Sequence, residues 1–175
     1  MNVLKSTLCA AMLAGCIAGQ ARAQDCGGTC TTQFEVYLDV VASCSFTGST
    51  DVAFGSVPVI VGQQLDAYGS LTVSCNVPVA YRIGLDAGLH GSGVNDRRMA
   101  SAGGEFIAYQ LYSGATGTTP CTATAGAPWG DASGGCVYGD SYAGTPQDIQ
   151  IHGRLTIANP RAGTYSDTVT ATITY

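Results

Sequence analysis

The chain ends on DTVTATITY, residues 167–175, in which apolar and polar residues alternate without interruption. Val169, Ala171, Ile173 and Tyr175 fall on one face, and four threonines fall on the other. A period of two is typical of a β-strand with one buried face. Similar alternating segments, separated by turns rich in Gly, Pro, Asn and Asp, occur at 71–75, 79–85, 107–111 and 149–157. With no convincing amphipathic helix, the sequence predicts an all-β protein, an antiparallel β-sandwich.

The first 23 residues have the pattern of a secretory signal peptide. Lys5 gives a positive start, an apolar run follows, and ARA at 21–23 matches a small-x-small cleavage site. The apolar run is too short to span a membrane. LAGC at 13–16 resembles a lipobox, and the alternative is that Cys16 is a lipidated N-terminus. We therefore expect export, without stable membrane insertion.

The mature chain is expected to be acidic. Removal of the signal leaves no lysine, five arginines and twelve acidic residues, a formal charge of −7. This charge disfavours nucleic acid and anionic membrane surfaces as partners. The only adjacent basic pair, Arg97 and Arg98 in NDRRM, is interpreted as part of a solvated turn with internal salt bridges; an anion site is the alternative.

Six cysteines remain after cleavage: Cys26, Cys30, Cys44, Cys75, Cys121 and Cys136. An even number in an exported chain indicates disulfides, and six cysteines allow about fifteen pairings. A Cys121–Cys136 bridge would close a loop of about 15 residues and stabilise the Gly-rich stretch 113–145 by roughly 3 kcal/mol. A Cys44–Cys75 bridge would close a longer loop, and Cys26 and Cys30 could pair together or between chains. The irregular spacing disfavours a zinc site, so we expect no metal.

No catalytic motif is present, because GxSxG, HExxH, the P-loop and GxGxxG are all missing. His90 lies in a predicted turn and His152 on the polar face of a predicted strand, and both are interpreted as facing solvent. Trp129 could stack on a sugar, although packing of its loop against the sandwich is the preferred interpretation. We expect no enzyme activity and no cofactor.

A second alternating segment, TTQFEVYLDVV at 31–41, lies close after the expected cleavage site. Its apolar face consists of Phe34, Val36, Leu38 and Val40. This face could fill the protein's own core, as its first strand, or the core of a neighbouring molecule. In a compromise, the early part donates and Val40-Val41 begin the first strand.

The segments ASCSF with DVAFGS, LTVSC, DRRM, IAYQLY, WGD, IHGRL and AGTYSDTVTATITY, in this order, resemble the spore coat protein U family. That family includes subunits of archaic (Csu-type) chaperone–usher pili. The resemblance runs from about Phe34 to Tyr175 and implies an immunoglobulin-like sandwich that lacks its final strand. It implies an N-terminal extension over 24–41 and a pilin domain over 42–175. In such pilins a periplasmic chaperone supplies the missing strand until, at the outer-membrane usher, the next subunit's extension replaces it.

The resemblance also implies roles for particular residues. The four apolar residues of the extension would fill successive pockets in a neighbour's groove, beside the strand that ends at Tyr175. Cys44 and Cys75 match the two family cysteines and would form the family's disulfide, whereas the other four cysteines depart from the family pattern. The implied function is a structural subunit of a surface pilus, serving adhesion and biofilm formation. The alternative is a secreted monomeric coat or carbohydrate-binding module that contacts its ligand through the loops and Trp129.

Overall fold

The computed structural model of the protein describes residues 28–58, 60–114 and 120–175. The expected signal peptide and Cys26 lie outside these residues. The chain divides into two units between Leu38 and Asp39. From residue 29 to residue 43 it contains neither helix nor strand. No helix among the described residues is long and apolar enough to span a membrane.

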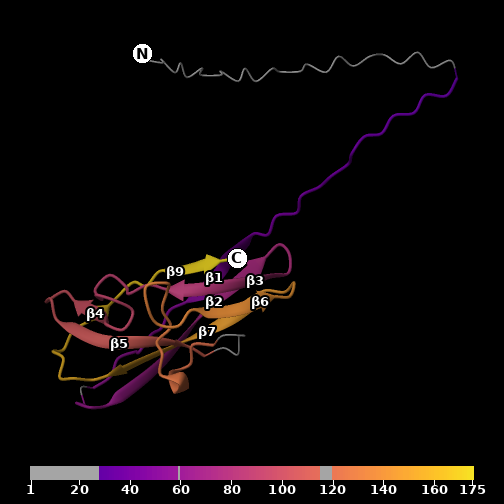
Figure 1. Cartoon of the computed structure of the whole chain (residues 1–175). Coiled ribbons are helices and arrows are strands. Elements are labelled where there is room, and N and C mark those ends of the chain that lie inside the picture. Colours follow the sequence, from indigo (N-terminus) through magenta and orange to yellow (C-terminus); the bar gives the residue numbers. More distant parts are fainter. Residues whose placement is uncertain (1–27, 59, 115–119) are drawn as a thin grey trace, which may run out of the picture. The chain divides into compact units, whose positions relative to one another are not determined.

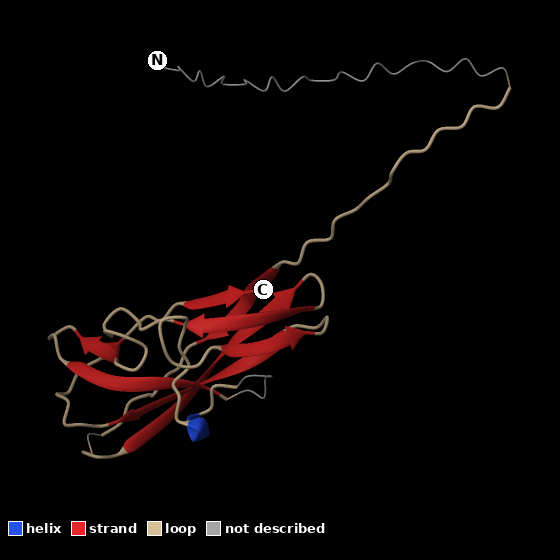
Figure 2. Cartoon of the chain, in the orientation of Figure 1, coloured by secondary structure: helices blue, strands red, loops and turns tan. Residues whose placement is uncertain are grey.

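The second unit is built from β-strands (Figures 1 and 2). Over the described residues these are β1 (Cys44–Thr50), β2 (Gln64–Cys75), β3 (Val79–Leu85), β4 (Arg97–Ser101), β5 (Phe106–Ser113), β6 (Tyr138–Tyr142), β7 (Gln147–Thr156), β8 (Tyr165–Ser166) and β9 (Ala171–Thr174). A short 3-10 helix, η1 (Ala123–Ala125), lies between β5 and β6.

The strands form two antiparallel sheets. One has six strands in the order β1-β2-β7-β5-β4-β8, and the other has three in the order β6-β3-β9. The longest ladder joins β2 to β7, from Gln64 opposite Thr156 to Val73 opposite Gln147. Every strand pair is antiparallel. The prediction of an all-β, antiparallel protein is therefore confirmed.

Both sheets contribute alternate residues to one hydrophobic core. The core cluster contains Leu71, Val73 and Cys75 of β2, and Tyr81, Ile83 and Leu85 of β3. This is the period of two that the sequence shows in 71–75 and 79–85. The core is therefore made of the inward-facing residues of both sheets, which pack against each other.

Two disulfides hold the second unit. Cys44 is bonded to Cys75, its direct cross-strand partner in the β1–β2 ladder. Cys121 is bonded to Cys136, which closes the loop that contains η1. These are the two pairings considered from the sequence. Cys30 is disulfide-bonded as well, and its pairing with Cys26 stays a prediction.

The interpretation of Arg97 as a solvated residue is wrong. Arg97 begins β4 and its side chain is fully buried, at 0% exposure. Its Nε and Nη2 donate hydrogen bonds to the carbonyl oxygen of Asp86, and Nη2 also donates to that of Leu85. These carbonyls replace part of the water that the guanidinium loses on burial, whereas Nη1 is buried without a hydrogen-bond partner among the described residues. Arg98 behaves as predicted and pairs with Asp96 at 2.8 Å.

Trp129 packs the Gly-rich stretch onto the core, as preferred from the sequence. Its side chain is fully buried, and its indole Nε1 donates a 2.8 Å hydrogen bond to the carbonyl oxygen of Ile83. Its ring lies 5.4 Å from that of Tyr138 on β6. A fully buried tryptophan has no face to offer a sugar, so the alternative in which Trp129 contacts a carbohydrate is wrong.

Candidate functional site

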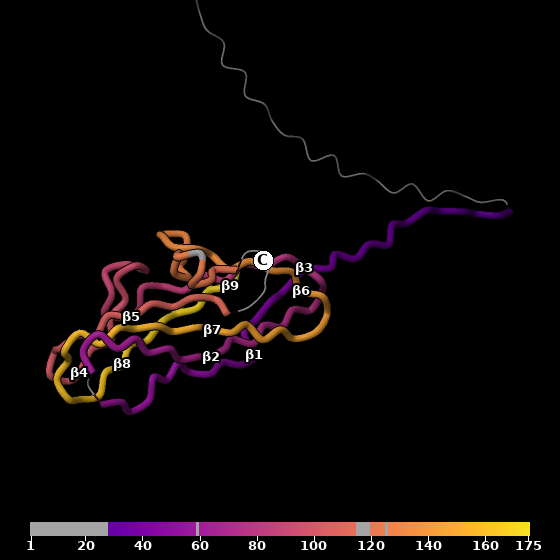
Figure 3. The backbone as a smooth tube through the Cα atoms, turned by 90° about the horizontal axis from the view of Figure 1, so that it is seen from below, coloured from indigo at the N-terminus to yellow at the C-terminus, as the bar shows by residue number. Residues whose placement is uncertain are grey.

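The last segment of the chain crosses from one sheet to the other. β8 pairs with β4 in the six-stranded sheet (Figure 3), whereas β9 pairs with β3 in the three-stranded sheet. β9 and β1 are therefore outer strands of different sheets, and each pairs through one side only among the described strands. Between them the two sheets leave a groove with a volume of about 800 Å³.

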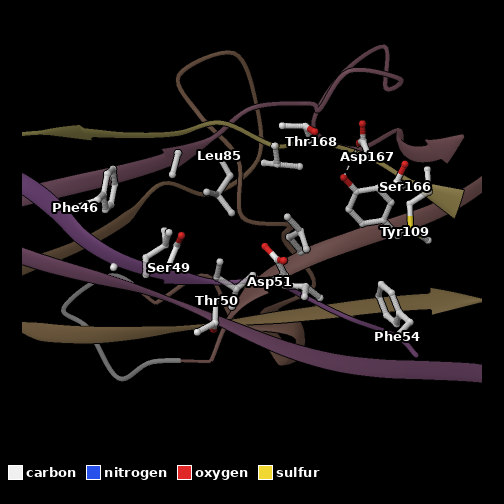
Figure 4. Close-up of a pocket in the computed structure, with 18 of the residues that line it drawn as sticks. Phe46, Ser49, Thr50, Asp51, Phe54, Leu85, Tyr109, Ser166, Asp167 and Thr168 are labelled. Carbon is white, nitrogen blue, oxygen red and sulfur yellow. Dashed lines mark hydrogen bonds between the residues drawn. The ribbon is translucent and has the colours of Figure 1, made fainter. Parts of the chain in front are cut away.

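The groove has two walls and an apolar floor. One wall is formed by residues 46–52 of β1 and the turn after it, and the other by residues 165–169 and Ala171 (Figure 4). The floor consists of buried side chains from four strands: Leu71, Leu85, Leu111 and Ile151. The groove thus opens directly onto the hydrophobic core.

The side chains along the walls are incompletely covered. Phe46, Val169 and Ala171 pack against the core but are only partly buried. Leu71 and Leu85 beneath them are 7% and 2% exposed. The walls therefore present apolar surface that one further element could cover.

A close approach of the chain fixes one end of the groove. Val52 and Phe54 lie over Gly153 of β7, where a side chain would overlap Val52 and come into tight contact with Phe54. Glycine at this position therefore lets the segment after β1 cross the inner face of the sheet. Val52 and Phe54 both line the groove at this end.

Hydrogen bonds anchor the segment between β8 and β9. Asp167 accepts a 2.7 Å hydrogen bond from the hydroxyl of Tyr109 and a 2.9 Å bond from the amide of Leu89. Burial, together with this bond to Asp167, raises the pKa of Tyr109. Three residues further on, the amide of Thr170 donates to the carboxylate of Asp86 at 2.9 Å. This wall of the groove is therefore a fixed part of the domain.

The carboxylate of Asp86, directly after β3, also anchors the last segment of the chain. Burial alone would raise the pKa of its carboxyl, but hydrogen bonds from the backbone amides of Thr170 and Gly88 lower it below the usual range. An ionised Asp86 therefore joins the end of β3 to the last segment of the chain.

The four apolar residues predicted to act as a donor strand are exposed. Phe34, Val36 and Leu38 are 83%, 86% and 84% exposed, and Val40 is 68% exposed. They lie in a segment without regular secondary structure. Within the described chain this apolar face therefore fills no core, and its role as a donor strand stays a prediction.

A polar cluster on the outer face of the six-stranded sheet was not predicted. His152 Nε2 lies 2.7 Å from Asp66 Oδ1, and Arg154 Nε donates to the same oxygen at 2.8 Å. The ring of Tyr68 stacks on that of His152 at 4.8 Å. The hydrogen bonds from Arg154 and His152 lower the pKa of Asp66 to about 2. The sequence holds no local signal for this cluster, because Asp66 and His152 meet only through the β2–β7 register.

Comparisons with known proteins agree with this architecture. The sequence profile of the Spore Coat Protein U domain matches residues 30–172. Protein U of Myxococcus xanthus is 30% identical over an alignment of 191 positions, which covers all of both chains.

Among solved structures, one similar chain comes from the crystal structure of the CsuC–CsuE chaperone–tip adhesion subunit pre-assembly complex, from archaic chaperone–usher Csu pili of Acinetobacter baumannii. The TM-score is 0.52 and the identity 23%, so the likeness is one of fold. The match covers 78% of this chain and 40% of that chain.

Proposed function

Because the chain belongs to the Spore Coat Protein U domain family, we propose that it is a structural subunit of a surface pilus that polymerises by donor-strand exchange. In this proposal the two sheets form an immunoglobulin-like sandwich that lacks its final strand. Residues 34–40 of one subunit complete the sandwich of the next. The role is structural, in adhesion and biofilm formation, with no catalytic site.

The observation that carries the proposal is the open groove between β1 and residues 165–171, which lead into β9. A strand placed there would find an unpaired strand edge on each side and the apolar floor beneath it. Extended segments add to sheets in this way, with backbone hydrogen bonds giving affinity and alternate side chains filling pockets. The groove is therefore suited to a strand in which every second residue is apolar.

The extension has the matching pattern. Its four apolar residues are two positions apart, so in an extended conformation all of them point to one side. Each of these side chains stabilises by roughly 1.5–3 kcal/mol when it moves from water into an apolar site. In this proposal the extension is exposed in the single chain because its apolar surface is buried only in the groove of a neighbouring subunit.

The geometry of this exchange generates a fibre. A subunit that donates through its N-terminus and accepts through its groove makes head-to-tail contacts, which do not close on themselves. Open edges of this kind also aggregate unless they are covered. We therefore propose that, after export, a periplasmic chaperone covers the groove until an outer-membrane usher exchanges it for the next subunit's extension. The fold likeness to a chain solved in a complex of a chaperone with a tip adhesion subunit supports this step.

The test uses three forms of the mature protein: the intact chain, a chain lacking residues 24–40, and a fusion of the latter with TTQFEVYLDVV linked after Tyr175. A second fusion, in which the four apolar residues are threonine, is the matched control. All are analysed by size exclusion and on unheated denaturing gels. We expect a ladder from the intact chain only and a heat-stable monomer from the first fusion only. A stable monomer from the intact chain, destabilised by the deletion, would show instead that the segment fills its own core.

A further inference from the structure

The chain leaves the domain at a fixed point beside the Cys44–Cys75 disulfide. The amide of Ser43 donates a 2.8 Å hydrogen bond to Asn76 Oδ1, and Asn76 Nδ2 donates a 2.9 Å bond to the carbonyl oxygen of Val41. The amide of Asn76 also donates to the carbonyl oxygen of Ser43 at 3.0 Å. Asn76 thus ties residues 41–43 to the domain through both ends of its side-chain amide.

We propose that Asn76 is a positioning residue that fixes the junction between successive subunits of the fibre; this inference rests on the proposed function. The tie ends at Val41, and the proposed donor strand ends at Val40. No residue then separates the two subunits. The partner at this junction is a second copy of the chain.

The short connection brings the two domains into direct contact. A residue spans at most about 3.3–3.6 Å, and Val40 in the groove is directly followed by Val41, which is tied to the donating domain. The mouth of the accepting groove must therefore lie against the end of the donating domain where Asn76 sits. Val40 and Val41 are 68% and 75% exposed in the single chain. At such a junction both apolar side chains are covered by the next subunit, which accounts for their presence at a fixed surface position.

The consequence is a stiff fibre. A junction bends through the residues that are free to rotate, and none lies between Val40 in the groove and Val41, which Asn76 holds. Without the side chain of Asn76, the backbone bond to Ser43 and the disulfide remain, and Val41 and Ala42 are freed. Two free residues then enter each junction, and we expect the persistence length of the fibre to fall by about twofold.

Two substitutions test the inference in fibres of the mature chain. Asn76→Ala removes both side-chain bonds, and Asn76→Asp keeps the acceptor for Ser43 but loses the donor to Val41. Asn95→Ala, at an exposed asparagine outside the junction, is the matched control. Electron micrographs give the persistence length, and hydrogen exchange of the wild-type chain reports the protection of the Ser43 amide.

We expect a protected Ser43 amide, and fibres that bend about twofold more in both Asn76 variants but not in Asn95→Ala. A rapidly exchanging Ser43 amide in the wild type would overturn the inference without any variant. Fibres of both Asn76 variants that are as stiff as wild-type fibres would overturn it while the proposed function stands. A wild-type chain that forms no fibre would overturn the proposed function, and the junction with it.

Discussion

Truncation of one side chain in the extension, Leu38→Ala, separates the fibre from the monomer. In the single chain Leu38 is 84% exposed and lies in no strand. Its truncation should therefore change the free energy of unfolding of the monomer by less than about 0.5 kcal/mol. In the fibre the same side chain would be buried in the groove of the next subunit.

The expected cost at the junction follows from the atoms removed. Leucine loses three carbons on truncation to alanine, and each buried methylene contributes about 0.8 kcal/mol, which gives about 2–3 kcal/mol. A cavity left in the groove would add to this value. Since about 1.4 kcal/mol corresponds to a factor of ten, subunits should leave the fibre about 30- to 150-fold faster.

The assay follows the release of subunits from preformed fibres in denaturant by size exclusion. Tyr37→Ala is the matched control, because Tyr37 is 85% exposed and falls on the opposite face of the alternating segment. We expect faster release from Leu38→Ala fibres and little change from Tyr37→Ala fibres. Equal effects of the two substitutions would refute the assignment of the apolar face. A loss of 2–3 kcal/mol in the Leu38→Ala monomer itself would refute donation altogether.

Three further predictions concern the domain itself. The folded-state pKa of Asp66, about 2, lies below the unfolded value, so its stabilisation is present above about pH 4 and is lost as the pH falls to about 2; unfolding free energies of Asp66→Asn should show less acid dependence over this window. Loss of the Cys121–Cys136 bridge by double substitution to serine should cost about 3 kcal/mol in denaturant titrations, and no change would mean that the loop is held by packing alone. Trp129→Phe should cost about 1–3 kcal/mol, because the carbonyl oxygen of Ile83 loses its donor; an unchanged thermal midpoint would contradict this.

The local alternation of apolar and polar residues predicts most of the fold. The segment 79–85 is predicted as a strand, and β3 spans Val79–Leu85. The final run 167–175 is predicted as one strand, yet only Ala171–Thr174 of it forms a strand, β9, and residues 167–170 connect β9 to β8 in the other sheet. The cause is a set of long-range hydrogen bonds that join Asp167 and Thr170 to the loop after β3. Such hydrogen bonds depend on the tertiary arrangement, so they cannot be predicted from an alternating pattern.

Residue composition gives the wrong prediction where polar or small residues are buried. The sequence predicts Arg97 in a solvated turn with internal salt bridges, but the carbonyl oxygens of Leu85 and Asp86, at the end of β3, accept its hydrogen bonds. Strand β6, with the sequence YGDSY, was not predicted inside the Gly-rich stretch. Its partner, β3, lies more than fifty residues away along the chain, so pairing rather than local propensity decides its conformation.

The family resemblance and the structure agree on the candidate groove. The family resemblance predicted a groove beside the last strand, and the structure shows the groove with an apolar floor of Leu71, Leu85, Leu111 and Ile151. The residues of the floor were recognisable as core positions, because they alternate with polar ones. The path of residues 51–54 could not be predicted in this way, since it depends on the space left by Gly153.

The central claim, that the groove accepts residues 34–40, is tested most directly by thermal unfolding of a chain lacking residues 24–40 with added synthetic peptide TTQFEVYLDVV. The control peptide carries threonine at the four apolar positions. The account predicts that the unfolding midpoint rises with the concentration of the first peptide, corresponding to about 2.7 kcal/mol at a hundredfold excess over Kd, and is unchanged by the second. A midpoint that neither peptide moves, or that both move equally, would contradict it.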